Sequence, residues 1–310
     1  MSWGDKRFHS LNYHLRRKFG TKVFKVPLDP GFTCPNRDGT KGVGGCAFCS
    51  AAGSGDFAGD RALPVKDQFR QVTRLMHSKW PDAKYLAYFQ AFSNTYAPPS
   101  VLRQLYDSVL EEEGVVGLSI ATRPDCLPDQ VLDLLKEFNQ ITYLWVELGL
   151  QTIHEATSQA MNLGYGWREF VKAVQELRAG HIAVCPHIIL GLPGENREMM
   201  METAYALADL DIQGIKIHLL HVMQGTPLAL MYEESRFQLM EQAEYVNLVV
   251  DILEVLPAQV IIHRLTGDSP RQSLIGPGWS LKKWEVLNSI DRELESRQTY
   301  QGAKWRNGLV

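Results

Sequence analysis

The chain carries three of its five cysteines in the stretch Cys34-Pro35-Asn36-Arg37-Asp38-Gly39-Thr40-Lys41-Gly42-Val43-Gly44-Gly45-Cys46-Ala47-Phe48-Cys49. The glycines and the proline of this stretch disfavour a continuous helix or strand, so we expect a loop. Eleven residues separate the first cysteine from the second, and two separate the second from the third. A loop can fold three thiolates around one point, which is the geometry that an inorganic centre requires.

Three thiolates without a nearby fourth ligand favour an iron–sulfur cluster over zinc. A structural zinc site takes four ligands, usually Cys or His. His14 and His77 flank the loop at a distance, and Cys126 and Cys185 lie far along the chain. A 4Fe–4S cluster normally takes one cysteine for each iron, so three cysteines would leave one iron open to an outside ligand. A zinc site and three free thiols are the alternatives.

This cysteine loop resembles the cluster-binding loop of the radical SAM superfamily, including the aromatic Phe48 just before the last cysteine. The resemblance implies a 4Fe–4S cluster on Cys34, Cys46 and Cys49, whose open iron chelates S-adenosylmethionine (SAM). It also implies reductive cleavage of SAM to a 5′-deoxyadenosyl radical, with an electron donor such as flavodoxin or ferredoxin as partner. The long first gap is similar to that of the branch containing the Elongator catalytic subunit and bacterial Elongator-like proteins.

The composition is that of an ordinary globular protein. The chain has 310 residues, of which 45% are hydrophobic and 22% are charged, so it can bury the core of one α/β barrel. Residues 1–20 carry charges throughout, unlike a signal peptide, and no apolar run approaches the roughly 20 residues that span a bilayer. An odd number of clustered cysteines favours a reducing compartment. We therefore expect a cytoplasmic protein without a membrane partner.

Strand-like and helix-like runs alternate along the chain, which predicts a parallel sheet with helices outside it. The strand-like runs are nearly all apolar, as burial on both faces requires; they occupy residues 23–28, 85–90, 115–121, 142–148, 182–189, 214–220 and 259–263. Helical patterns occupy residues 65–79, 98–113, 128–138, 167–179, 196–210 and 237–256.

From this alternation we predict an α/β fold with a partial TIM-like (β/α) barrel of about six parallel strands. We expect one domain, with residues 22–266 as the core and helical extensions at residues 1–21 and 267–310. In the second extension, Trp284, Leu287 and Ile290 follow the apolar spacing of a helix.

Polar residues at the carboxyl ends of the strands are the ones expected to take part in chemistry in such a barrel. Thr122-Arg123-Pro124-Asp125 and Val146-Glu147-Leu148-Gly149-Leu150-Gln151 resemble segments of the Elongator-type enzymes, and Gly191-Leu192-Pro193-Gly194 resembles the superfamily turn near the adenine of SAM. The resemblance and the strand-end positions imply that SAM contacts come from Gln90, Ser93, Asn94, Thr122, Arg123, Glu147, Gln151 and His187. No residue is assigned a catalytic role.

Glu147 is the most informative of these positions. Strand alternation places Glu147, Gly149 and Gln151 on one face. A carboxylate at the mouth of an apolar barrel is costly unless something pairs with it. The ribose hydroxyls or amino group of SAM would serve, and the alternative is a buried salt bridge to Arg123 or Lys216.

Basic and aromatic residues gather near both ends of the chain, although the net charge of −3 gives no overall nucleic-acid signature. The basic residues include Arg16, Arg17, Lys18, Lys282 and Lys283. Such a mixture can bind phosphates and stack on unpaired bases, or it can be a solvated helix face. The Elongator-like resemblance implies tRNA as a partner and its wobble uridine, or the side chain of that base, as substrate. The alternatives are a radical SAM enzyme acting on a protein or small metabolite, and a non-catalytic metal-stabilised RNA-binding module.

Overall fold

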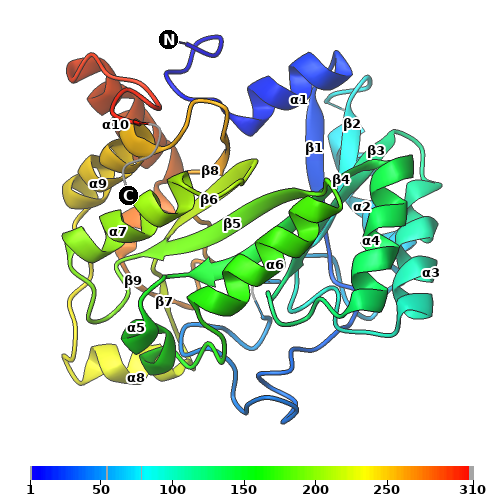
Figure 1. Ribbon diagram of the computed structural model, residues 1–310, viewed down its shortest axis with the longest axis horizontal. Coiled ribbons are helices and arrows are strands. Elements are labelled where there is room, and N and C mark those ends of the chain that lie inside the picture. The colour runs from blue at the N-terminus through cyan, green and yellow to red at the C-terminus, as the bar shows by residue number, and fades with distance from the viewer. Residues whose placement is uncertain (1, 54, 78, 307–310) are drawn as a thin grey trace.

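Seven parallel strands form one curled sheet at the centre of the computed structural model, which describes residues 2–53, 55–77 and 79–306 (Figure 1). The strands are β1 (Val23–Leu28), β2 (Lys84–Phe89), β3 (Val115–Thr122), β4 (Tyr143–Gln151), β5 (Ala183–Leu190), β6 (Gly214–Leu219) and β8 (Ile261–Arg264), paired in that order. Every neighbouring pair is parallel. The predicted partial barrel is confirmed, with one strand more than the six expected.

Amphipathic helices between the strands cover the outside of the sheet (Figure 1). Helix α5 (Glu155–Ala160) is not among them and lies below the sheet in this view. The covering helices are α2 (Val65–His77), α3 (Pro99–Leu110), α4 (Asp129–Ile141), α6 (Trp167–Ala179), α7 (Arg197–Ala208) and α9 (Gln242–Val255). Side chains from these helices and from both faces of the strands belong to one large apolar core. Burial on both faces is the reason that the strands read as continuous apolar runs in the sequence.

The segment before β1 lies at the amino ends of the strands. Helix α1 (Leu11–Phe19) begins at Ser10, whose side chain accepts a hydrogen bond from the backbone N–H of Tyr13, and it ends at Gly20 in the left-handed conformation. Ser10 pairs with Ile262 of β8, and the side chain of Lys84, the first residue of β2, donates a hydrogen bond to the Phe19 carbonyl (3.5 Å). The basic end of α1 therefore lies at the end of the barrel opposite to the carboxyl ends of the strands.

The segment after β8 packs beside α9 through helix α10 (Lys283–Ser296). Helix α10 buries Val286, Ile290 and Leu294, whereas the side chain of Trp284 is 76% exposed. The expectation that Trp284 belongs to the apolar stripe is therefore wrong. Two residues along a helix correspond to more than half a turn, so Trp284 lies on the opposite side of α10 from Val286.

A small two-stranded ribbon closes part of the carboxyl edge of the sheet. Its strands are β7 (Val222–Met223) and β9 (Leu274–Gly276), which pair antiparallel, and it is flanked by α8 (Pro227–Glu233) and a 3₁₀ turn over Gly278–Leu281. A second apolar cluster lies here, apart from the main core, and includes Ala47, Leu163, Val222 and Leu228. This cluster gives the cysteine loop an apolar floor of its own.

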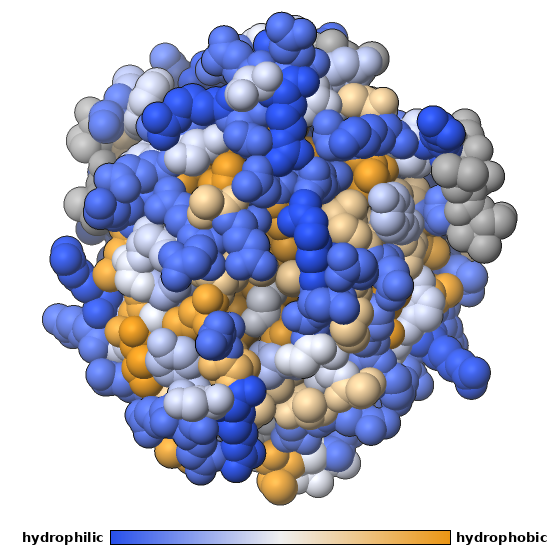
Figure 2. Space-filling model, turned by 90° about the vertical axis from the view of Figure 1, so that its left-hand side faces the viewer, coloured by the Kyte–Doolittle hydropathy of each residue, from blue (hydrophilic) through white to orange (hydrophobic). Residues whose placement is uncertain are grey.

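Hydrophobic residues are interspersed with polar ones on the face of the molecule that Figure 2 presents, which is the left-hand side of Figure 1. Tyr205 on α7 and Leu230 on α8 are among the exposed hydrophobic side chains, at 52% and 62% exposure. Of the helices that the structure describes, none combines the length and the apolarity needed to cross a bilayer.

Close packing between β3 and β4 predicts a strong effect of adding one methyl group at Gly117. A Cβ atom at this position would overlap the carbonyl oxygen of Tyr143, which is backbone and cannot move aside cheaply. We expect Gly117→Ala to lower the free energy of unfolding by about 1–3 kcal/mol, measured by denaturant unfolding. Gly278→Ala is the matched control, because a Cβ there meets nothing within 4 Å. Equal stability of the two variants would contradict the register that sets Gly117 against Tyr143.

Candidate active site at the carboxyl ends of the strands

The three cysteines of the loop after β1 face a common cavity. Each is partly exposed, and all three line a cavity of about 150 Å³ together with residues from the strand ends. Burial, followed by repulsion from the neighbouring Cys49 and Cys34 sulfurs, raises the pKa of Cys46 to about 12. A thiolate is thus unfavourable in the loop by itself, and a bound cationic centre would offset this cost.

The conformation of the cysteine loop is held by hydrogen bonds that its own side chains donate to backbone carbonyls. Asn36 donates to the Asn162 carbonyl (2.6 Å), and its amide nitrogen lies 3.8 Å from the Cys46 sulfur. Arg37 donates to the carbonyls of Cys49 (2.9 Å) and Ser50 (2.5 Å). The loop is therefore built around the third cysteine by side chains within it and by the segment before α6.

The long gap between the first two cysteines forms a small hairpin that lies against the ends of β2 and β3. Asp38 and Val43 form an antiparallel bridge. Thr40 accepts a hydrogen bond from Tyr96 (2.8 Å), and Lys41 forms an ion pair with Asp125 (2.9 Å). The extra residues thus brace the loop from outside, and the spacing of eleven residues still brings all three cysteines to one cavity.

The donor set of this cavity fits a cluster held by three thiolates. Within the described part of the chain, no three His, Cys, Asp or Glu side chains converge on a site for a single metal ion. Cys126 and Cys185 are buried and do not belong to the cavity lining. The assignment of Cys34, Cys46 and Cys49 as ligands of a 4Fe–4S cluster stays a prediction, with which this lining is compatible.

Most of the predicted SAM contacts lie around the same cavity as the cysteines. The lining includes Gln90, Ser93, Thr122, Arg123, Glu147, Gln151 and His187. Asn94 is fully buried outside the lining, where its amide donates to the carbonyls of Phe89 (3.0 Å) and Ala121 (2.9 Å). The structure therefore gathers seven of the eight positions, while Asn94 joins the ends of β2 and β3. The assignment of these residues to SAM stays a prediction.

Arg123 places a permanent positive charge beside the first cysteine. Burial opposes this charge, but the two hydrogen bonds to Asp125 (2.8 and 2.9 Å) prevail and raise the pKa of Arg123. Its guanidinium lies 4.7 Å from the centre of the Tyr165 ring, and its Nη1 atom lies 4.0 Å from the Cys34 sulfur. Such a charge stabilises thiolates and an anionic ligand nearby.

Glu147 is completely buried and forms ion pairs with Lys25 and Lys216. Its carboxylate also accepts a hydrogen bond from Ser119 (2.5 Å) and lies 2.9 Å from Nε2 of His187. Burial opposes ionisation, but Lys216 and Lys25 hold the pKa of Glu147 well below its usual value. Of the two salt bridges considered from the sequence, the one to Lys216 is present, and Arg123 pairs with Asp125 instead.

Lys25 is a site residue that sequence reasoning missed, and Lys216 was considered only as a possible partner of Glu147; both line the cavity region. Their amino groups each lie 4.4 Å from the centre of the Tyr88 ring, and Lys216 donates a hydrogen bond to the Tyr88 hydroxyl (2.8 Å). Burial lowers the pKa of Lys216 to about 7. The signal available in the sequence was a lysine within each of two apolar strands, where an unpaired charge is costly.

A larger cavity of about 620 Å³ adjoins the first one. The two cavities share lining residues, among them Cys49, Gln151 and His218. The larger one extends past the ends of β6 and β8 to the 3₁₀ turn, where Leu281 and Lys283 line it. The cysteines therefore lie at one end of a continuous space that extends to the 3₁₀ turn.

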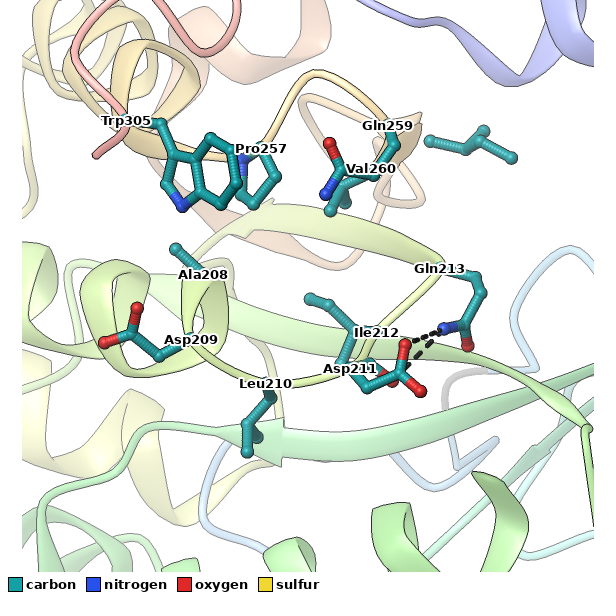
Figure 3. A pocket seen from close by; sticks show the side chains of 11 residues that line it. Ala208, Asp209, Leu210, Asp211, Ile212, Gln213, Pro257, Gln259, Val260 and Trp305 are labelled. Carbon is teal, nitrogen blue, oxygen red and sulfur yellow. Dashed lines mark hydrogen bonds between the residues drawn. The ribbon is translucent and has the colours of Figure 1, made fainter. Parts of the chain in front are cut away.

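A further hollow lies away from this site, at the amino ends of β6 and β8 (Figure 3). Its lining includes Asp209, Gln213 and Trp305, and Gln213 donates a hydrogen bond to Asp211 (2.8 Å). In a parallel α/β barrel, chemistry is found at the carboxyl ends of the strands, so we assign this hollow no part in the site.

Comparison with known proteins identifies a family over most of the chain. A model of the radical SAM superfamily matches residues 33–207, and a model of the radical SAM C-terminal domain matches residues 212–296. Uncharacterized protein YtqA of Bacillus subtilis (strain 168) is 59% identical over 298 residues, which are 96% of this chain and 92% of that protein.

More distant similarities lead to proteins of the Elongator type. The tRNA uridine(34) acetyltransferase of Methanocaldococcus jannaschii is 28% identical over 170 residues, covering 53% of this chain and 30% of that protein. The solved structure of Methanocaldococcus infernus Elp3 with an N-terminal deletion has a TM-score of 0.67 at 16% identity, covering 90% of this chain and 64% of that one. This structural likeness shows the fold.

The buried ion pairs predict a large and pH-dependent effect of Glu147→Gln. Removing the carboxylate leaves two buried ammonium groups without a partner, so we expect a loss of about 3–5 kcal/mol in the free energy of unfolding. Lys216, whose pKa is about 7 in the native protein, will release its proton at lower pH in the variant. Since the unfolded state keeps that proton, the variant gains stability relative to the native protein as the pH rises towards 7.

Denaturant unfolding at pH 5, 6 and 7 measures this change. Glu137→Gln is the matched control, because Glu137 pairs with Arg103 on the surface with its side chain 59% exposed, and a surface pair contributes little. If Glu147→Gln lowers the free energy of unfolding by no more than Glu137→Gln does, the buried network does not stabilise the barrel.

Proposed function

The chain belongs to the radical SAM superfamily, and from this we propose that it modifies the wobble uridine of tRNA or the side chain of that base. As a member of this superfamily, it is an enzyme that uses a 4Fe–4S cluster and SAM. When bound, the cluster supplies the electron that cleaves SAM to a 5′-deoxyadenosyl radical, which can abstract hydrogen from an unactivated carbon. The observation that carries the proposal is the second cavity, which adjoins the cysteine-lined one and has room for a nucleobase.

The residues of the chain divide the work between the two cavities. Cys34, Cys46 and Cys49 would hold the cluster, and the strand-end residues around them would hold SAM. The side chain of Phe48 lines both spaces beside the cysteines. Such an apolar wall excludes water, which protects a reactive intermediate from side reactions.

The charges of the larger cavity support a phosphate-bearing substrate. Its lining contains the cationic side chains Lys25, Lys216, Arg264 and Lys283 and the carboxylates Asp56 and Asp268. Asp268 is already paired with Lys283 (2.6 Å) and lies 3.7 Å from Arg264. Lys25 and Lys216 balance the buried Glu147. The four cations exceed Asp56, Asp268 and Glu147 by one charge, and such a positive surplus attracts nucleic acid and raises its association rate.

The proposed site of modification in tRNA, the wobble uridine, rests on the more distant relatives. The tRNA uridine(34) acetyltransferase of Methanocaldococcus jannaschii is named for the wobble uridine, and it matches half of this chain. From that relative we transfer to this chain only the identity of the substrate base, because the matched region is 30% of that protein. Hydrogen abstraction at this base or its side chain is the chemistry that a radical SAM barrel can provide.

The structure separates the two basic ends of the chain. Arg16, Arg17 and Lys18 lie in α1, at the amino ends of the strands, far along the barrel from the cysteines. Lys283 lines the larger cavity. Its two neighbours in the sequence are Lys282 and Trp284, and the side chain of Trp284 is exposed. We therefore propose that RNA meets the rim formed by residues 281–284, and that the basic end of α1 is a solvated helix face.

Loss of the gene should change the modified nucleosides of bulk tRNA, which mass spectrometry of tRNA digests measures. The native gene should restore the wild-type pattern, whereas a gene carrying Cys46→Ala should not, because its product lacks one cluster ligand and should contain little iron after anaerobic purification. Cys126→Ala is the matched control, since Cys126 is buried outside the cavity lining. An unchanged tRNA in the deletion strain would sink the proposed substrate, and full iron content in Cys46→Ala would refute the ligand assignment.

The rim residue Trp284 predicts a separate effect on RNA binding. We expect Trp284→Ala to weaken binding of an anticodon stem-loop RNA about tenfold, because stacking on an aromatic side chain contributes about 1–3 kcal/mol per base. Fluorescence anisotropy at fixed salt concentration measures this affinity. Trp80→Ala is the control: its side chain is 42% exposed, but it lies just before β2, at the amino ends of the strands. Equal losses in the two variants would exclude a specific contact at the rim.

A further inference from the structure

The long segment between the first two cysteines contains side chains that lie beside the sulfurs. Asn36 and Arg37 are near its start, and Nδ2 of Asn36 lies 3.8 Å from the Cys46 sulfur. Burial raises the pKa of Cys49, and the charge of Arg37 and a hydrogen bond from it oppose this rise. Asp56 acts on Cys49 in the opposite sense to Arg37, but less strongly. The loop therefore provides a nitrogen donor to two of its three sulfurs.

The third nitrogen donor comes from the end of β3. Arg123 directly follows this strand, and its Nη1 atom lies 4.0 Å from the Cys34 sulfur. At about 4 Å, a positive charge or an N–H dipole stabilises an anionic sulfur even where the hydrogen bond is long. Each of the three sulfurs thus has one donor near it, and we call Asn36, Arg37 and Arg123 the donor residues.

Backbone carbonyls hold Asn36 and Arg123 in place. Asn36 donates to the Asn162 carbonyl (2.6 Å), and Arg123 donates to the Leu163 carbonyl (2.9 Å). Both side chains belong to buried residues, which are 1% and 6% exposed. Buried groups with fixed partners keep their orientation, so they can stabilise a charge that appears nearby without first having to reorganise.

Two glycines leave the space that the donors of the loop occupy. A Cβ atom on Gly42 would overlap the side-chain oxygen of Asn36, and one on Gly45 would lie 2.7 Å from Nε of Arg37. Any larger residue at these positions would displace the donor from its place beside the sulfur. The glycines of the loop therefore make room for the donors, in addition to permitting its turns.

Ion pairs connect Arg123 with the hairpin of the cysteine loop. Arg123 pairs with Asp125 (2.8 Å), and Asp125 pairs in turn with Lys41 (2.9 Å). Two cations and one carboxylate leave this triad with one net positive charge, to which Arg37 adds another beside Cys49. The surroundings of the sulfurs are therefore positively charged, and the long gap between the first two cysteines supplies much of that charge.

We propose that the donor residues raise the reduction potential of the cluster that the three cysteines are predicted to hold, and that Asp125 and Lys41 fix the orientation of Arg123. Reduction adds one electron from a low-potential one-electron carrier, and no bond forms or breaks. The added negative charge spreads over the sulfurs, where N–H donors and positive charges stabilise it. Hydrogen bonds to the sulfurs and the net charge around them are among the properties that set the potentials of such clusters.

A redox titration of the anaerobically reconstituted full chain, followed by electron paramagnetic resonance without SAM, measures this potential. We expect Arg123→Gln and Arg37→Gln each to lower the equilibrium constant for one-electron reduction about tenfold, which is a shift of 59 mV to lower potential. Arg123→Lys and Arg37→Lys keep the charge and should restore most of the potential. A purely structural role would alter stability or iron content and leave the potential unchanged.

Arg178→Gln is the matched control. Arg178 also pairs with a carboxylate, that of Asp211 (2.8 Å), and donates to a backbone carbonyl, that of Ile182 (2.9 Å). It lies in the last turn of α6, at the amino ends of the strands, so its replacement should leave the potential at the native value.

Lys41→Gln keeps the test decisive if the arginine variants fail to assemble the cluster. The side chain of Lys41 is 43% exposed, so its loss leaves the packing intact. It should lower the potential by less than Arg123→Gln does, and by a smaller amount at high salt. Native potentials in Lys41→Gln and in every arginine variant that retains its iron overturn the proposal. A native potential in Lys41→Gln alone overturns the part assigned to Lys41 and Asp125.

Iron content separates this inference from the assignment of the cysteines on which it rests. Full iron content in Cys46→Ala overturns that assignment and the inference with it. An iron-free Cys46→Ala together with native potentials in the variants of the donor residues overturns the role of the donors alone. The proposed tRNA substrate is decided separately by the nucleosides of the deletion strain, because the potential is measured without RNA.

Discussion

The buried carboxylate of Glu147 and the two lysines that pair with it determine what the inside of this barrel can be. Lys25 comes from β1, Glu147 from β4 and Lys216 from β6, so the ion pairs join strands that are far apart in the sheet order. They can meet only because the sheet curls. Burying three charges is costly unless each is paired, and here the arrangement of Lys25 and Lys216 around one carboxylate provides that pairing. The interior is consequently polar at this level, with cavities in place of a solid apolar core.

The cysteine loop is held by a different kind of constraint. It leaves β1 and lies on a separate apolar cluster, where the backbone N–H of Ala47 donates to the Met161 carbonyl and the Leu228 N–H donates to the Ala47 carbonyl (both 2.9 Å). The segment between Cys46 and Cys49 is thereby hydrogen-bonded both to the turn before α6 and to α8. A loop fixed at its centre in this way can present three sulfurs without an ordered helix or strand, and the glycines permit the turns on either side.

The sequence was sufficient for the barrel and for most of the residues around the cavity. Apolar runs in alternation with amphipathic patterns indicate βα units because burial on both faces has few other solutions, and residues after such runs meet at one edge of the sheet.

The failures have equally physical causes. Asn94 is one residue beyond Ser93, yet its side chain points inward and donates hydrogen bonds to the carbonyls of Phe89 and Ala121. The direction of a side chain in an irregular segment cannot be predicted from hydrophobic periodicity. Lys25 looks like part of a basic terminus until the curled sheet brings it to Glu147. Trp284 fits an apolar spacing with Leu287 and Ile290, but the docking angle of α10 on α9 buries Val286, Ile290 and Leu294 instead, and that angle is a tertiary property.

Two kinds of side chain line the larger cavity, and their effects reach over different distances. The charges of Arg264 and Lys283 near its opening act through space and favour any polyanion, and salt weakens their effect. The imidazoles of His218 and His221, whose pKa values burial lowers, act only at hydrogen-bonding distance, where salt has little effect. Lys216 stands between these groups, with a pKa near 7 and an ion pair to Glu147 that the barrel itself requires. Because its charge is already paired with Glu147, Lys216 adds little to the attraction of a polyanion.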